Sequence, residues 1–183
     1  MESFNQLNSQ LVNENVYAIL PDKGGNLLLG TLSALVSFNP EKKSFTTIDK
    51  EKDGTPFTSQ RITILFRDSH KRLWVGGEEG ISVFQQEGIE IEKVPILPES
   101  SVTKTFTNCI YEAANGIIWV GTREGFYCFN EKEKKIKRYT TANGLPNNVV
   151  YGILEDTFGR LWVSTNRGIS CFNPETERFR NFT

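Results

Sequence analysis

Short apolar segments alternate with polar turns along the whole chain, and the same alternation occurs four times. Leu28, Trp74, Trp119 and Trp162 occupy one shared place in it and stand 46, 45 and 43 residues apart. Because one substrate meets one reactive centre, a motif stated four times indicates a repeated scaffold. The four matching segments are GNLLLGT, KRLWVGG, GIIWVGT and GRLWVST, which begin at residues 25, 71, 116 and 159.

The apolar pattern inside each repeat predicts four short antiparallel strands. Every repeat carries a phenylalanine ten residues after the shared place and another apolar residue seven positions further on. The segments are rich in β-branched and aromatic residues, and they follow one another too closely for crossover helices. The apolar pairs are Phe38 and Phe45, Phe84 and Ile91, Phe129 and Ile136, and Phe172 and Phe179.

Four strands in a period of forty to fifty residues are the unit of a β-propeller. We therefore predict an all-β chain, a single propeller fragment over residues 1–183, and we expect it to be part of a larger propeller. Residues 1–10 fit the outer strand of a preceding blade. The four blades are expected at about 11–50, 57–96, 102–140 and 145–183.

Burial explains why the aromatic positions recur. A blade with apolar side chains on both faces needs a neighbour against each face. At ~25 cal/mol per Å² of apolar surface, large rings dominate this stacking. The first repeat departs from the others, with Leu28 in place of tryptophan and Ala34 in place of a turn glycine. The predicted structural core consists of Trp74, Trp119, Trp162, Phe38, Phe84, Phe129 and Phe172.

An aspartate recurs beside the turn that precedes the second strand, at Asp22, Asp68 and Asp156. Recurrence indicates turn-forming residues whose carboxylates accept hydrogen bonds from nearby main-chain amides. A glycoside hydrolase would instead need two converging carboxylates in different environments. The sequence shows no such pair, so the aspartates are interpreted as structural.

Composition narrows the classes of partner. Hydrophobic residues make up 38% and charged residues 23% of the chain, as in ordinary soluble globular proteins. A net charge of −1 gives no basic excess to neutralise phosphates, so we expect no nucleic-acid partner. No segment approaches the ~20 apolar residues of a membrane-spanning helix, and the N-terminal residues lack the pattern of a signal peptide.

The three cysteines and the single histidine form no catalytic or metal-binding pattern. Cys128 and Cys171 hold one repeat position in neighbouring blades, and Cys109 lies on a first strand. Facing sheets stand ~10 Å apart, whereas a disulfide needs Cα atoms within ~7 Å, so three free, buried thiols are expected. His70 is interpreted as a solvated turn residue. We expect neither a metal site nor a cofactor.

The fourth repeat, ILEDTFGRLWVSTNRGISCFNPETERFRNF, resembles the two-component regulator propeller repeat. The second and third repeats fit it with Lys71 and Ala113 as departures, and the resemblance extends over residues 11–183. It implies a non-catalytic, periplasmic sensor region of a hybrid histidine kinase/response regulator of Bacteroidetes that responds to oligosaccharides. Two other classes stay open: a scaffold that docks protein partners, and a lyase or glycoside hydrolase on the same fold.

Ligand binding is expected where loops gather. In a propeller the turns between second and third strands, and the connections between blades, open on one face. Arginine and asparagine side chains that differ between similar repeats are candidates for binding a polar ligand there, and a solvated rim is the alternative. An open arc would also expose apolar end faces, which predicts self-association. The candidate residues are Arg123, Asn166, Arg167, Asn108, Asn148 and Tyr151.

Overall fold

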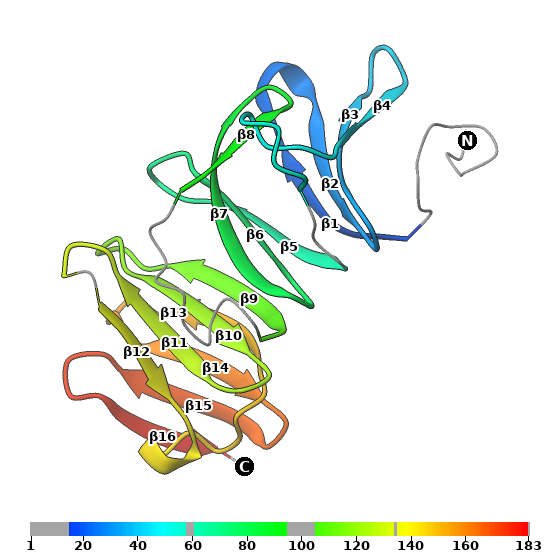
Figure 1. Ribbon diagram of the computed structural model, residues 1–183. Coiled ribbons are helices and arrows are strands. Elements are labelled where there is room, and N and C mark those ends of the chain that lie inside the picture. Colours follow the sequence, from blue (N-terminus) through cyan, green and yellow to red (C-terminus); the bar gives the residue numbers. More distant parts are fainter. Residues whose placement is uncertain (1–14, 58–60, 95–104, 134, 183) are drawn as a thin grey trace. The chain divides into compact units, whose positions relative to one another are not determined.

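The chain folds into four four-stranded antiparallel sheets, which confirms the all-β prediction (Figure 1). The structure is a computed structural model that describes residues 15–57, 61–94, 105–133 and 135–182. The sheets belong to two compact units, Met1–Lys104 and Thr105–Thr183, called unit 1 and unit 2 below. Residues 1–10, expected as an outer strand of a preceding blade, lie outside the described ranges.

Unit 1 contains two sheets in which consecutive strands are hydrogen-bonded neighbours. The short turn η1 (Lys23–Gly25) joins the first two strands. The first sheet comprises β1 (Val16–Pro21), β2 (Leu27–Thr31), β3 (Leu35–Asn39) and β4 (Ser44–Ile48), and the second comprises β5 (Ile62–Arg67), β6 (Leu73–Gly77), β7 (Gly80–Glu87) and β8 (Glu90–Lys93).

Unit 2 repeats the same order of strands. The short turn η3 (Thr141–Asn143) lies between its two sheets, where Thr140 and Asn143 form a capping box. Its sheets are β9 (Thr107–Glu112), β10 (Ile118–Thr122), β11 (Phe126–Asn130) and β12 (Lys135–Tyr139), followed by β13 (Val150–Glu155), β14 (Leu161–Thr165), β15 (Gly168–Asn173) and β16 (Arg178–Phe182).

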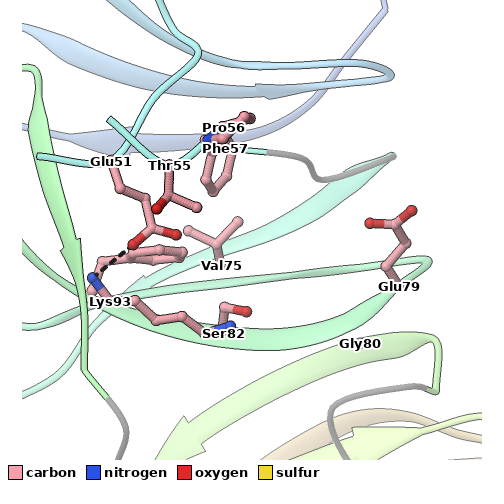
Figure 2. A pocket seen from close by; sticks show the side chains of 10 residues that line it. Glu51, Thr55, Pro56, Phe57, Val75, Glu79, Gly80, Ser82 and Lys93 are labelled. Carbon is pink, nitrogen blue, oxygen red and sulfur yellow. Dashed lines mark hydrogen bonds between the residues drawn. The ribbon is translucent and has the colours of Figure 1, made fainter. Parts of the chain in front are cut away.

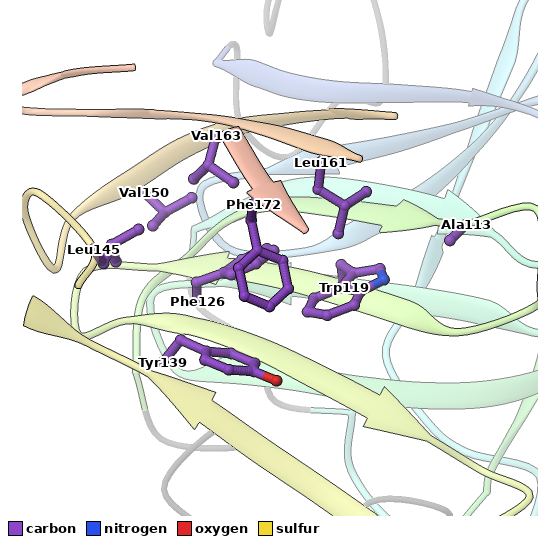
Figure 3. Close-up of a cluster of buried hydrophobic side chains, with 9 residues drawn as sticks. All are labelled: Ala113, Trp119, Phe126, Tyr139, Leu145, Val150, Leu161, Val163 and Phe172. Carbon is purple, nitrogen blue, oxygen red and sulfur yellow. The ribbon is translucent and has the colours of Figure 1, made fainter. Parts of the chain in front are cut away.

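The recurring rings form the core of unit 2 (Figure 3). Trp119 stacks on Phe126 with ring centroids 4.8 Å apart and meets Phe172 of the next sheet edge-on at 5.5 Å. Leu161 and Val163 of β14 complete the same cluster and are fully buried. Trp119 of the third sheet therefore faces the fourth sheet. Leu161 and Val163, which flank Trp162 in the fourth sheet, face back toward the third.

Unit 1 uses the same arrangement with aliphatic residues. Leu28 and Leu35 of the first sheet pack against Ile62, Leu73 and Val75 of the second, and all five are buried. Leu28 thus fills the place that tryptophan has in the other repeats.

Close approach of the sheets explains a glycine at the end of the second strand. A Cβ atom on Gly30 would stand 2.6 Å from Ile62 Cγ2, and one on Gly121 would stand 2.6 Å from Val150 Cγ1. Such distances are too short for any side chain, so these positions require glycine. Ser164 holds the corresponding place in β14, where its side chain lies over Gly152.

The register of the first strand shifts by one residue in all four sheets. In each sheet the pairing of the first strand with the second skips one residue of the first strand. The skipped residues are Tyr17, Thr63, Asn108 and Tyr151. A β-bulge turns a side chain away from its regular direction. The side chain of the bulge residue in each first strand is therefore not required for packing in the core.

The hairpin of β7 and β8 departs from the other three outer hairpins. Phe38, Phe129 and Phe172 each pair with the apolar residue seven positions later. In the second sheet Ile91 instead pairs with Gln86, and Lys93 pairs with Phe84. A two-residue turn at Gly88, whose φ is +62°, produces this register shift of two residues.

Burial differs among the residues expected in the core. Trp74, Trp119, Phe84, Phe129 and Phe172 are at most 4% exposed. Trp162 and Phe38 are partly exposed. Trp162 faces away from the core of unit 2 and stacks on Phe182, with ring centroids 5.6 Å apart.

The expectation of three free, buried thiols is correct for the bonding and only partly correct for the burial. All three cysteines are free, but only Cys171 is buried, whereas Cys109 and Cys128 are partly exposed. Within the described ranges, no helical segment has the length and apolar character that a membrane span requires.

Candidate functional site

The recurrent aspartate forms a structural clasp in two of the sheets. Asp68 accepts hydrogen bonds from the main-chain N–H of Arg72 at 2.8 Å, from Arg72 Nε at 2.7 Å and from Trp74 Nε1 at 2.8 Å. Asp156 makes the same three contacts with Arg160 and Trp162. The aspartates therefore fix the turn and the tryptophan, and their geometry confirms the interpretation as turn residues.

Asp22 behaves differently, and the prediction that it caps its own turn is wrong. Its side chain forms no cap. Asp22 Oδ1 accepts from Arg67 at 3.2 Å and Asp22 Oδ2 accepts from Gln86 at 3.0 Å, both in the neighbouring sheet. The first repeat has Leu28 in place of tryptophan, so no indole N–H is available to this carboxylate, and it joins the two sheets of unit 1 instead.

The rim of unit 2 brings three of the candidate residues together. The bulge in β13 leaves Tyr151 53% exposed, and its hydroxyl donates to Asn166 Oδ1 at 2.8 Å. Asn166 and Arg167 are exposed in the turn between β14 and β15. The main-chain N–H of Arg167 donates to Thr165 Oγ1 at 3.0 Å, which holds this turn in place. We call Tyr151, Asn166 and Arg167 the tyrosine rim.

The other three candidates have separate positions in unit 2. Arg123 lies over the ring of Phe106, with its guanidinium carbon 4.1 Å from the ring centroid. Asn108 Nδ2 donates to the carbonyl of Val150 at 2.8 Å and so joins β9 to β13. Asn148 Oδ1 accepts from the main-chain N–H of Thr141 at 2.9 Å. Arg123 is therefore presented on an aromatic ring, whereas the two asparagines hold main-chain groups.

Unit 1 contains a pocket of about 250 Å³ that the sequence did not single out (Figure 2). Its apolar lining includes Val75, Phe84 and Phe57, and Phe57 meets Phe84 edge-on at 5.5 Å. Its polar lining comes from the connection between the sheets, from the turn between β6 and β7, and from β7 and β8. The polar residues used below are Glu51, Thr55, Glu79, Ser82 and Lys93; we call this site the inter-sheet pocket.

The pocket was missed because its residues are not a motif. Glu51, Thr55 and Phe57 belong to the connection DKEKDGTPFTSQ, which the sequence marks only as a turn-rich segment. The usable signal is its length, since 13 residues separate Ile48 from Ile62 whereas 10 separate Tyr139 from Val150. Phe106 beneath Arg123 was missed for a similar reason, because it precedes β9 and has no counterpart at the shared positions.

Among the described residues, the titratable groups show no arrangement for nucleophilic or metal-assisted chemistry. Burial raises the pKa of Cys109 to about 12 and that of Cys128 to about 11, which keeps both thiols protonated at neutral pH. His70 is exposed between β5 and β6. In the part of the chain that the structure describes, no three His, Cys, Asp or Glu side chains gather as a metal site would need.

In each unit two four-stranded sheets stack on each other, with aromatic rings between them in unit 2 and mainly aliphatic side chains in unit 1. This arrangement defines a protein built from β-propeller blades. Residues 100–124 and 144–167 match the family described as two component regulator propeller. These matches fall on the third and fourth repeats, and they are to the family that the fourth repeat was found to resemble.

One curated relative extends the match over most of the chain. Histidine kinase P4 of Formosa agariphila is 29% identical over 161 residues, which are 84% of this chain and 12% of that kinase. This chain therefore corresponds to about an eighth of the kinase's length.

Solved structures with the same fold include the extracellular domain of a putative two component system and a lyase. The extracellular domain of a putative hybrid two component system from B. thetaiotaomicron superimposes with a TM-score of 0.72 and 23% identity, over 92% of this chain and 23% of that domain. Virginiamycin B lyase from Staphylococcus aureus gives a TM-score of 0.61 and 17% identity, over 91% of this chain and 55% of the lyase. At such identities the likeness shows the fold alone.

Proposed function

We propose that this chain is a non-catalytic, extracytoplasmic sensor region of a hybrid two-component regulator, and that its tyrosine rim binds an oligosaccharide. The family repeats and the similarity to a histidine kinase support the sensor role. The extracellular origin of the B. thetaiotaomicron domains supports a periplasmic location. In the regulator, ligand binding would favour one of two pre-existing arrangements and so shift the signalling equilibrium.

One observation carries the ligand assignment: the exposed Tyr151 donates a hydrogen bond to the exposed Asn166, and the exposed Arg167 follows Asn166 in the same turn. Tyr151 is fixed by its hydrogen bond to Asn166, so little side-chain entropy is lost on binding. The ring supplies an apolar surface for the C–H face of a sugar. Asn166 and Arg167 supply donors, and Asn166 also an acceptor, for its hydroxyl groups.

Calorimetry with a panel of defined tetrasaccharides tests this function. We expect heat of binding with at least one glycan. Tyr151→Ala should weaken binding at least about tenfold, since an aromatic anchor that the ligand covers contributes ~2 kcal/mol or more and a tenfold change needs ~1.4 kcal/mol. Tyr17→Ala is the matched control, because Tyr17 occupies the same bulge position in β1 of unit 1.

Three outcomes would count against the proposal. Binding of protein partners without heat from any glycan would favour a docking scaffold. Turnover of a glycan by the purified chain would establish an enzyme. Equal losses in Tyr17→Ala and Tyr151→Ala would remove the tyrosine rim from the site.

A further inference from the structure

We infer that the inter-sheet pocket of unit 1 is a separate binding site for one neutral sugar ring. This inference rests on the proposed function, because it assigns part of the same ligand class to a second place. The pocket exists because the second sheet departs from the repeat in two ways, and both departures act at the same spot.

The first departure replaces the apolar cross-strand partner of the phenylalanine, here Phe84, by a charged residue. In the other three sheets the equivalent phenylalanine pairs with Phe45, Ile136 or Phe179. The register shift of β8 places Lys93 opposite Phe84 instead. A lysine stem covers apolar surface while its ammonium reaches toward water, so Phe84 stays 2% exposed and a charged group stands where the other sheets have an apolar one.

The second departure builds a wall beside Phe84. The connection between the sheets is three residues longer than its counterpart in unit 2, and the additional length forms a closed turn. Glu51 N–H donates to the carbonyl of Thr55 at 2.8 Å, and Gly54 N–H donates to the carbonyl of Glu51 at 2.9 Å. Lys52 N–H donates to the carbonyl of Ile91 at 2.8 Å, which fastens the turn to β8.

The wall is therefore ordered before a ligand arrives. Glu51 Oε2 accepts from the main-chain N–H of Lys93 at 3.2 Å, and Phe57 N–H donates to the carbonyl of Asp49 at 2.9 Å (Figure 2 shows the Glu51 contact). Preorganised sites lose less entropy on binding than loops that must fold around a ligand.

The lining fits an amphipathic ring. The half-buried Phe57, which stands edge-on to Phe84, offers the apolar contact, and the buried Phe84 and Val75 lie beneath it at 2% and 3% exposure. Around them lie the hydroxyls of Thr55 and Ser82 and the carboxylates of Glu51 and Glu79. A sugar ring has the same division, with C–H groups on its faces and hydroxyls at its edge. Carboxylates accept strong hydrogen bonds from hydroxyl groups.

Size and charge restrict the ligand further. Sites for drug-sized ligands usually measure ~300–1,000 Å³, so a volume of about 250 Å³ suits one ring and not a chain. Glu79 has no hydrogen-bond or ion-pair partner among the described residues. The lining carries two carboxylates and one ammonium, that of Lys93, so its net charge is negative and repels an acidic sugar. The pocket should therefore accept neutral hexoses and pentoses and reject uronic acids.

Saturation-transfer NMR with single monosaccharides tests this site. The probes are D-glucose, D-galactose, D-mannose and D-xylose, with D-glucuronate and D-galacturonate as acidic counterparts. We expect transfer to at least one neutral sugar and to neither uronate. Ser82→Leu, which fills the pocket from β7, should reduce the signal at least about tenfold, since lost shape complementarity removes more than ~1.4 kcal/mol.

A second variant gives a readout that simple unfolding would not produce. The isosteric double substitution E51Q/E79Q removes both charges, and we expect it to admit the uronates. Glu175→Gln, which changes an exposed carboxylate in the turn between β15 and β16, should leave all monosaccharide signals unchanged.

The outcomes separate this inference from the proposed function. If tetrasaccharides bind but no neutral monosaccharide gives a signal, the pocket assignment is wrong and the sensor proposal is unaffected. The same holds if Ser82→Leu leaves the monosaccharide signal unchanged. If E51Q/E79Q still rejects uronates while binding neutral sugars, the charge argument is wrong. If no carbohydrate of any length binds, both proposals fail.

Discussion

At the scale of single residues, one turn position of the repeat adopts the left-handed backbone conformation that favours glycine. Gly25, Gly116 and Gly159 share a turn position and adopt φ values of +78°, +80° and +73°. The second repeat has Lys71 there with φ +64°. A non-glycine residue in the left-handed region costs roughly 1–2 kcal/mol. Lys71 is therefore a point of stored strain in an otherwise regular turn.

Replacing Lys71 by glycine should stabilise the protein. Both contacts of Lys71 in the turn use main-chain atoms: its N–H donates to the carbonyl of Asp68, and its carbonyl accepts from Arg67 Nη1, so glycine keeps them. The relief of strain exceeds the added entropy of the unfolded chain, and we expect a gain of about 1 kcal/mol.

Chemical denaturation measures this gain. Gly116→Ala is the matched control, because a Cβ atom on Gly116 would meet no other atom within 4 Å and only the φ of +80° opposes a side chain. It should lower the unfolding free energy by about the same amount. A lower stability of Lys71→Gly would show that the lysine side chain contributes a contact that outweighs the strain.

At the scale of elements, the clasp closes the turn between the first and second strands. Burial tends to raise the pKa of Asp156, but hydrogen bonds from Trp162, from the main-chain N–H groups of Arg160 and Phe158 and from the Arg160 side chain outweigh it. The pKa is lowered from 3.8 to about 2. The turn of β13 and β14 is thus held by the ionised carboxylate.

Acid should weaken this turn over a defined range of pH. A carboxylate whose pKa is lower in the folded state stabilises the fold above its unfolded pKa and loses that contribution as pH falls to the folded value. We expect Asp156→Asn to be less stable than the wild type at neutral pH. The difference should shrink between about pH 4 and pH 2.

Urea denaturation across that range, followed by tryptophan fluorescence, measures the difference. Glu175→Gln, which removes an exposed carboxylate from the turn between β15 and β16, controls for the loss of one charge. A difference between Asp156→Asn and the wild type that stays constant from neutral pH into the acid range would contradict the role of the ionised clasp.

At the scale of the whole molecule, the last sheet presents an outer face that matches a buried one. In the last sheet Leu154 pairs with Trp162, and Ile169 pairs with Phe182. The corresponding pairs in the preceding sheet are Tyr111 with Trp119 and Phe126 with Tyr139. There the rings meet the next sheet. Leu154, Ile169 and Phe182 are instead 64%, 46% and 39% exposed.

We propose that this face binds the same face of a second copy. A two-fold pairing would bury the apolar rows of both copies against each other, as blade stacking does within unit 2. Sedimentation velocity should show a dimer that dissociates on dilution. The double variant L154S/I169T should weaken the association at least about tenfold, which corresponds to ~1.4 kcal/mol of lost apolar burial.

Ile89→Thr serves as the control, because Ile89 is 54% exposed but lies in the turn between β7 and β8. It should leave the dimer unchanged. A monomer at every concentration, or equal effects of both sets of substitutions, would contradict the proposed interface.

The repeat itself determined the all-β fold, the four sheets and the clasp aspartates Asp68 and Asp156. It could do so because a side chain that packs between sheets must recur at the period of the blade, whatever lies around it. Trp119, Phe172 and the glycine at Gly121 follow from that single requirement. Variation between the copies also indicates the bulge residues Tyr151 and Asn108 as candidates.

Only the tertiary structure decided where the repeat fails. The register of β8, the closed turn at Glu51 and the diversion of Asp22 to Arg67 and Gln86 each depend on a neighbouring sheet. Sequence periodicity describes what each blade has in common, whereas hydrogen bonds and packing between blades form among residues far apart in the chain. A pocket built from such departures has no pattern of its own, and it becomes visible only when the strands are in place.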